Sequence, residues 1–192
     1  MTTPRWTSTS DPYVTPGAGD AWANEAAARG RTGTQQLLGV ETLTPETPIR
    51  TALALGEEGQ AVVRRRLILE DDQPVELADS YYPFWLASGT PLAENRKIRG
   101  GAIAVLAQLG HTAATITEHI TARQPTEAQR TLLDIGADEP LLVMRRLSRN
   151  TDGTPVEYVV THTVSRLSPG FTYSYSGSTP GGSAPCSAAV RT

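Results

Sequence analysis

The chain has 192 residues, 39% of them hydrophobic, which suits one domain that buries a core without disulfide bonds. Its 17 lysines and arginines against 20 aspartates and glutamates give a formal charge of −3, which argues against a dedicated nucleic-acid binder, although a local basic patch stays compatible with it. The single cysteine, Cys186, excludes an internal disulfide. Because there is neither an apolar run of membrane-spanning length nor a signal-peptide core, we expect a cytoplasmic protein without a membrane partner.

The N-terminal residues predict an arm rather than a core element. Residues 1–19 are rich in Thr, Ser, Pro and Gly, a composition typical of extended linkers. Trp6 and Tyr13 are the large side chains available to anchor this arm on the body or on a partner chain. Asp20 is placed to cap a short helix that ends at Gly30. We therefore expect an arm or linker with one short helix over residues 1–33.

The strongest organisational signal is a repeated hairpin. Residues 61–83 comprise an apolar β-branched run, an acidic turn and an alternating run, the pattern of two antiparallel strands. Residues 141–163 repeat this plan about eighty residues later, so that Pro74-Val75-Glu76 corresponds to Pro155-Val156-Glu157.

Short helices precede both hairpins, and strands and one further helix fill the intervals. The helices are expected at 48–55 and 125–133, the strands at 36–43 and 112–122, and the intervening helix at 102–110. The repeated helix–hairpin unit predicts an α+β fold, with a mostly antiparallel sheet and helices on one face. Residues 176–192 have the small and polar composition of a disordered tail.

Strand parity separates the arginines of the first hairpin. Arg66 shares a face with Arg64 and Ile68, whereas Arg65 lies on the face of Leu67, which is the better candidate for the core. In a hollow, an arginine grips a carboxylate or phosphate bidentately. From the residues alone, most of these arginines are better explained as solvated strand residues that discourage edge-to-edge aggregation.

A second candidate anion site precedes the helix at 102–110. Arg99, Gly100 and Gly101 stand immediately before that helix, where free backbone N–H groups can cradle an anion. The same residues fit an ordinary helix start with solvated basic side chains.

The remaining reactive residue types give no catalytic or metal-binding pattern. His111, His119 and His162 lack the clustered spacing of metal ligands, which favours structural or exposed roles. We find no nucleophile–base pair, phosphate loop or dinucleotide fingerprint, so no metal and no cofactor are expected.

The two hairpin motifs, the helix ending in Leu109–Gly110 and the run from Pro125 to Tyr158 resemble the UTRA domain. This is the effector-binding domain of the HutC branch of GntR transcription regulators, and the resemblance covers about residues 34–173. It implies a chorismate-lyase-like fold over residues 34–175, a pocket for a small and often anionic effector, and a homodimer. It also implies that DNA is read only through an absent or separate helix-turn-helix domain. Since Met1 stands where the family's linker begins, the chain is expected to be a fragment, a start-site artefact or a stand-alone effector domain.

The resemblance also implies a set of ligand contacts. Arg66 matches the first arginine of the family's ligand-gripping Arg-x-Arg, and Ile68 takes the place of the second. Thr163 stands where sugar-phosphate binders have a tyrosine, so a less charged or more apolar ligand is favoured over a phosphorylated amino sugar. The predicted ligand-binding residues are Arg66, Arg99, Gly100, Gly101, Glu157 and Thr163.

Three functions compete at this stage. The leading hypothesis is a small-molecule-sensing effector domain without catalysis. The second is a stand-alone biosynthetic lyase or cyclase on the same fold, because fold does not determine function. The third is a stand-alone regulator that forms mixed dimers with full-length relatives.

Overall fold

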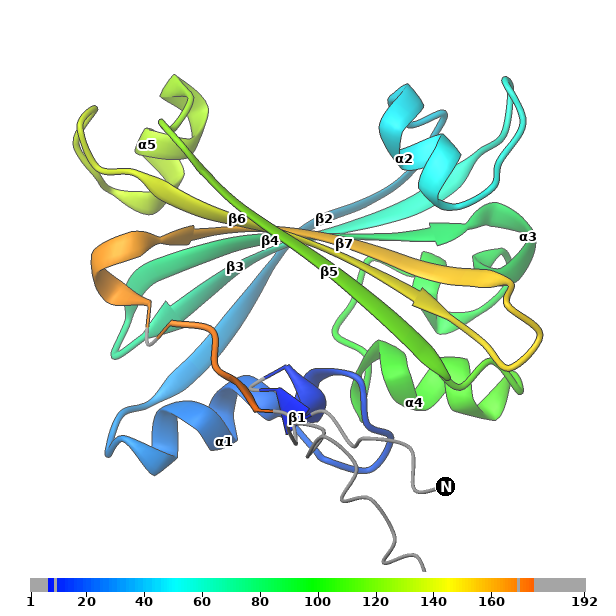
Figure 1. Cartoon of the computed structure of the whole chain (residues 1–192), viewed down its shortest axis with the longest axis horizontal. Helices are drawn as coiled ribbons and strands as arrows, with labels where there is room; N and C mark the ends of the chain where they lie inside the picture. Colours follow the sequence, from blue (N-terminus) through cyan, green and yellow to red (C-terminus); the bar gives the residue numbers. More distant parts are fainter. Residues whose placement is uncertain (1–6, 9, 169, 175–192) are drawn as a thin grey trace, which may run out of the picture.

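The computed structural model describes residues 7–8, 10–168 and 170–174, whose main feature is a six-stranded antiparallel sheet in the order β2-β3-β4-β7-β6-β5 (Figure 1). Its strands are β2 (Gly33–Leu43), β3 (Ala61–Glu70), β4 (Gln73–Pro83), β5 (Thr115–Arg123), β6 (Leu141–Arg149) and β7 (Pro155–Val164). The helices are α1 (Ala21–Ala28), α2 (Thr47–Ala52), α3 (Phe84–Ala87), α4 (Gly101–Gln108) and α5 (Glu127–Leu133). Single turns of 3-10 helix lie at Asp11–Tyr13, Pro91–Ala93 and Ser165–Leu167. A separate two-stranded ribbon pairs β1 (Thr7–Ser8) with β8 (Tyr173–Ser174).

The predicted α+β class and both hairpins are confirmed, and the repeat is larger than its hairpins. Each half of the sheet is a strand, a helix and a hairpin, with β2 corresponding to β5, and the halves meet where β4 pairs with β7. The repeated helices end alike, on a left-handed residue at Ala54 (φ 53°) and Asp134 (φ 52°). The sheet therefore has a pseudo-two-fold axis between β4 and β7.

The expectation that the helices cover one face is wrong. Helices α2 and α5 lie on one side of the sheet, and α1, α3 and α4 on the other (Figure 1). The reason is visible in β3, where the successive residues Val62 and Val63 are both 0% exposed although they point to opposite faces. A central strand that is apolar on both faces needs a covering layer on each.

The α2/α5 face is built around leucines. Leu53, which follows α2, packs with Val63 and Tyr158, and Leu133 of α5 packs with Leu67 and Leu141. Arg65 also lies on this face, where it forms an ion pair with Glu41. This face is therefore a packed core with an exposed ion pair at its edge.

The α1/α4 face is covered by α1, α3 and α4 and by the N-terminal arm, which runs between α1 and α4 (Figure 1). Trp22 of α1 donates a hydrogen bond from Nε1 to the carbonyl of Leu69 (2.8 Å) and packs beside Ile68. Gly33 permits this contact, because a Cβ there would come within 2.9 Å of the Trp22 ring. In the arm, Tyr13 donates to Glu25 of α1 (2.6 Å).

Some sequence-based expectations fall outside the described residues. Trp6, Cys186 and the tail at 176–192 belong to this group. Among the residues that are described, no helix is both long and apolar enough to cross a membrane.

Candidate functional site

Charged and hydroxyl side chains are concentrated on the α1/α4 face of the central strands. The antiparallel register places Arg64 opposite Ser80, Arg66 opposite Ala78, and Glu76 opposite Thr163. On the other half of the sheet, Arg146 lies opposite Val159, and Ser148 lies opposite Glu157. Polar groups gathered on one covered face are typical of a binding site rather than of a core.

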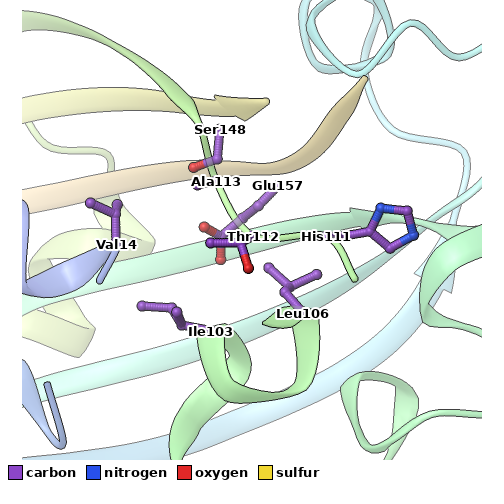
Figure 2. Close-up of a pocket in the computed structure, with 8 residues that line it drawn as sticks. All are labelled: Val14, Ile103, Leu106, His111, Thr112, Ala113, Ser148 and Glu157. Atoms are coloured by element: carbon purple, nitrogen blue, oxygen red, sulfur yellow. The ribbon is translucent and has the colours of Figure 1, made fainter. Parts of the chain in front are cut away.

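A small hollow, which we call the α4-side hollow, opens between this face and α4. Figure 2 shows Ile103 and Leu106 projecting from α4 on one side, and Ser148 and Glu157 from the sheet on the other. The full lining comprises Val14, Ile103, Leu106, His111, Thr112, Ala113, Ser148 and Glu157. The predicted strand at 112–122 begins only at Thr115, and the residues before it form the loop that lines the hollow.

The polar wall of the hollow is held from behind. Glu157 accepts a hydrogen bond from the buried hydroxyl of Tyr82 (2.7 Å). Burial and the adjacent Glu157 carboxylate raise the pKa of Tyr82 well above its usual value, so its hydroxyl remains a donor. Ser148 is 2% exposed, and its hydroxyl has no hydrogen-bond partner among the described residues. The wall thus offers a fixed carboxylate and a free hydroxyl.

At the side of the hollow, His111 is held by its neighbours. Its Nδ1 lies 3.4 Å from the side-chain nitrogen of Asn150, and its ring meets Trp85 edge-on with centroids 5.6 Å apart. Trp85 itself is 57% exposed. An exposed aromatic side chain next to a residue that lines a hollow can cover a ligand.

The first arginine of this face has a structural role. Arg64 is 5% exposed and donates to the backbone carbonyls of Leu92 (3.0 Å), Glu94 (2.8 Å) and Arg96 (2.7 Å). Burial lowers the pKa of Arg64 below its usual value. The guanidinium still carries its charge, because arginine is not deprotonated in proteins. Arg64 therefore fixes the loop that leads into α4.

Arg66 lies on the same face but outside the lining of the hollow. Its guanidinium donates to Gln35 Oε1 (3.2 Å) and to Ser80 Oγ (3.0 Å). Burial and Glu157 raise the pKa of Tyr82, and the Arg66 charge partly offsets this rise, so Arg66 is electrostatically connected to the Tyr82–Glu157 pair. These two bonds use two of the five N–H donors of the guanidinium, so Arg66 keeps donors for a further acceptor.

The pseudo-two-fold axis gives Glu157 a counterpart in Glu76. Thr163 donates to Glu76 as Tyr82 donates to Glu157, and in each pair the hydroxyl comes from the other repeat. Burial raises the pKa of Glu76, opposed by the Thr163 hydrogen bond and by the charges of Arg66 and Arg146. The face therefore carries two related glutamates, one beside α4 and one below the arm.

Comparison with known proteins now identifies the family. The UTRA domain model matches residues 28–166, which is most of the chain. The chain belongs to the UTRA domain family. Its resemblance to that family, first drawn from the hairpin motifs, is confirmed.

Relatives of this UTRA domain are transcription regulators. The chain is 30% identical over 138 residues to an HTH-type transcriptional regulator of Streptomyces coelicolor that is described as uncharacterised. That match covers 70% of this chain and 51% of the relative, so the chain spans about half the length of the curated relative that it matches.

Solved structures show the same fold at low identity. The effector domain of PhnF from Mycobacterium smegmatis superposes with a TM-score of 0.68 at 19% identity, over 78% of this chain and 90% of that one. The C-terminal domain of the histidine utilization repressor from Pseudomonas syringae superposes with a TM-score of 0.61 at 16% identity, over 70% and 92% of the two chains. These likenesses establish a fold shared with effector domains of regulators.

The structure separates the residues predicted for the ligand site of this UTRA domain. Glu157 lines the α4-side hollow, whereas Thr163 is bonded to Glu76 on the far side of the same face. Arg99, Gly100 and Gly101 are exposed at the start of α4, outside the lining, and the two glycines have φ values of 81° and 78°. Such values explain the two glycines by backbone geometry alone.

Other polar residues of the face were missed at the sequence level. Ser148 lines the hollow, and Glu118 of β5, Arg146 of β6 and Thr161 of β7 lie beyond it. The signal for Arg146 was present in the repeat, because it corresponds to Arg66. Within the described part of the chain, no group of three or more His, Cys, Asp or Glu side chains is arranged to hold a metal ion.

Proposed function

We propose that this UTRA domain is the small-molecule-sensing part of a GntR-type transcription regulator, of the HutC branch. The observation that carries the proposal is the α4-side hollow, where an apolar helix surface faces Glu157 and the Ser148 hydroxyl, which lacks a partner among the residues that the structure describes. A buried polar atom without a partner is costly unless a ligand or water completes it. The regulators among its relatives support a sensing role, and none of the compared relatives supports the lyase or cyclase alternative.

The lining of the hollow favours a particular kind of effector. Val14, Ile103 and Leu106 offer apolar surface, and Glu157 offers a carboxylate that accepts hydrogen bonds. We therefore propose a small, mainly apolar ligand with one polar group. This group either donates a hydrogen bond to the Glu157 carboxylate or is an amine that pairs with it. Arg66 is proposed as a contact for any acidic group that extends beyond the hollow, with Arg99, Gly100, Gly101 and Thr163 kept as peripheral contacts.

The replacement Glu157→Gln tests this proposal. Wild type and variant are screened by thermal shift against a panel of cellular metabolites, and compounds that raise the Tm are confirmed by calorimetry. Glutamine still accepts the Tyr82 hydrogen bond, so the fold should persist while affinity falls by about tenfold or more, since a charge-assisted hydrogen bond contributes about 1.5–3 kcal/mol.

The control variant is Glu58→Gln, in an exposed turn away from the site. It should bind each confirmed compound as the wild type does. A compound that binds wild type and Glu157→Gln with the same affinity binds outside the hollow. If no compound of the panel binds saturably, the proposal that this domain senses those classes of metabolite is contradicted.

The whole regulator is proposed to act as a cytoplasmic homodimer that reads DNA through a separate helix-turn-helix domain. The 192-residue chain alone should then show no sequence-specific DNA binding, because its formal charge is −3 and phosphate contacts need basic surface. A gel-shift titration with operator fragments at rising salt measures this. A salt-resistant, sequence-specific complex of the isolated chain would refute the expectation.

A further inference from the structure

We propose that Arg146, Thr161 and Glu118 form a subsite for a monocarboxylate that carries a hydroxyl or ammonium group beside its carboxyl group. We call these three residues the arm-side cluster, because they lie on the part of the α1/α4 face below the N-terminal arm. The inference rests on the proposed function, since it adds a second contact region to the same ligand-binding face, and its experiment is separable from the Glu157 test.

The cluster contains buried polar atoms without partners. Arg146 Nε, Glu118 Oε1 and Thr161 Oγ1 make no hydrogen bond within the described residues. The Arg146 and Glu118 side chains are each 9% exposed, and Thr161 is 5% exposed. Arg146 and Glu118 approach only to 3.8 Å, which is an ion pair but too long for a hydrogen bond.

Strand register brings the three residues together. Arg146 of β6 lies opposite Glu118 of β5 and opposite Val159 of β7, and Thr161 is two residues further along β7 on the same face. All three side chains are therefore neighbours on one surface of the sheet, within reach of one small molecule.

The other repeat shows what a satisfied version of this position looks like. Arg66, the counterpart of Arg146, donates to Gln35 and Ser80. Among the described residues, Arg146 Nε has no such amide or hydroxyl partner, although Arg146 is the more buried of the two arginines. The same scaffold position is thus filled by internal partners in one repeat and left open in the other.

Segments near both ends of the described chain, the arm and β8, lie over the arm-side cluster and form its roof. Tyr173 of β8 donates to Glu118 Oε2 (2.8 Å), and burial together with this bond raises the pKa of Tyr173 to about 12. The Arg146 charge also acts on Tyr13 of the arm, whose own hydroxyl is engaged by Glu25. This roof shields the cluster from water and strengthens its electrostatics.

The available donors and acceptors define the ligand. Arg146 Nε and the Thr161 hydroxyl can both donate to a carboxylate, and Glu118 Oε1 can accept from a donor attached next to it. Glu76 and Glu25 act on the same region and oppose a second negative charge. A phosphate dianion is therefore disfavoured relative to a 2-hydroxy or 2-amino monocarboxylate.

The first test is a stability signature. Thr161→Val keeps the side-chain shape and removes a buried unsatisfied hydroxyl, so without ligand it should raise the Tm by about 3 °C, the shift that about 1 kcal/mol gives in a domain of this size. Thr117→Val, at an exposed position of β5, should leave the Tm unchanged. A fall in Tm for Thr161→Val would mean that the hydroxyl is already partnered, and would overturn the proposal.

The second test uses glycolate as the probe, with acetate, inorganic phosphate and chloride at matched ionic strength. The Arg146 Nε–H resonance, assigned with Arg146→Lys, should shift saturably with glycolate, less with acetate, and only weakly with phosphate or chloride. Apparent glycolate affinity should fall about tenfold in Thr161→Val, the loss expected for one hydrogen bond to a charged group, and Arg146→Lys should abolish the glycolate-induced rise in Tm. Equal responses to glycolate and chloride would overturn the proposal.

Glu157→Gln separates this inference from the proposed function. Glycolate binding that survives Glu157→Gln and is weakened by Thr161→Val assigns the probe to the arm-side cluster. Glycolate binding that Glu157→Gln removes and Thr161→Val leaves intact assigns the probe to the α4-side hollow, which overturns this inference and supports the proposed function.

Discussion

Arg64→Ala is expected to lower the free energy of unfolding by about 3–5 kcal/mol, because each buried carbonyl that loses its donor costs about 1–3 kcal/mol. The Arg64 guanidinium satisfies the carbonyls of Leu92, Glu94 and Arg96, which belong to the segment between α3 and α4, where a single 3-10 turn at Pro91–Ala93 is the regular structure. Alanine would leave these carbonyls without their donor and open a space beside Leu92, which is 0% exposed. The loss should appear as a lower urea midpoint and as faster amide exchange from residue 91 through α4.

Arg65→Ala is the matched control, one residue along the same strand. Arg65 faces the opposite side of the sheet, its side chain is 38% exposed, and its partners are Glu41 and Asp79. Exposed ion pairs of this kind contribute about 0–1 kcal/mol, so this variant should stay close to the wild type. If Arg64→Ala lowered the free energy of unfolding as little as Arg65→Ala, the Arg64 bonds to the loop would not stabilise the fold.

Much of the sheet could be predicted from local sequence. The β-branched run at 61–69 and the Asp71–Asp72 turn define the first hairpin, and in the structure both aspartates adopt positive φ. The second hairpin follows because Pro155-Val156-Glu157 repeats the first motif. Strand parity then placed Arg65 and Arg66 on opposite faces correctly, since alternation is a property of the strand itself.

The site needed information that local sequence does not hold. Parity places Arg64 and Arg66 on one face, but only the path of residues 91–96 makes Arg64 a loop anchor and leaves Arg66 for Gln35 and Ser80. Ser148 and Thr161 look like ordinary strand residues until the neighbouring strands show that their hydroxyls have no partner within the described residues. Long-range contacts therefore decide which polar groups are satisfied and which remain available to a ligand.

The covering of both faces was also missed, for a related reason. Alternation was expected to leave one face for water or a ligand, yet Val62, Tyr82 and Val156 join Leu86, Leu92 and Leu106 in a core on the α1/α4 face. The proposed ligand site is consequently a polar patch inside a covered face. Its floor is the sheet, and its cover is a helix, a loop and the arm.

The second large effect is expected at Leu133, which anchors α5 on the α2/α5 face. Leu133 is 1% exposed and packs with Leu67, Leu77, Leu141 and Val164, so Leu133→Ala should cost about 2–5 kcal/mol through lost burial and a residual cavity. The preceding Leu132 is 43% exposed, and Leu132→Ala should stay within about 0.5 kcal/mol of the wild type. Urea unfolding of both variants measures the difference.

Because α5 lies on the face opposite Glu157 and Arg146, Leu133→Ala should leave ligand affinity unchanged in the folded protein. A reduced affinity at full folding would show that the two faces are energetically coupled, whereas a cost as small as that of Leu132→Ala would contradict the packing of α5 on the sheet.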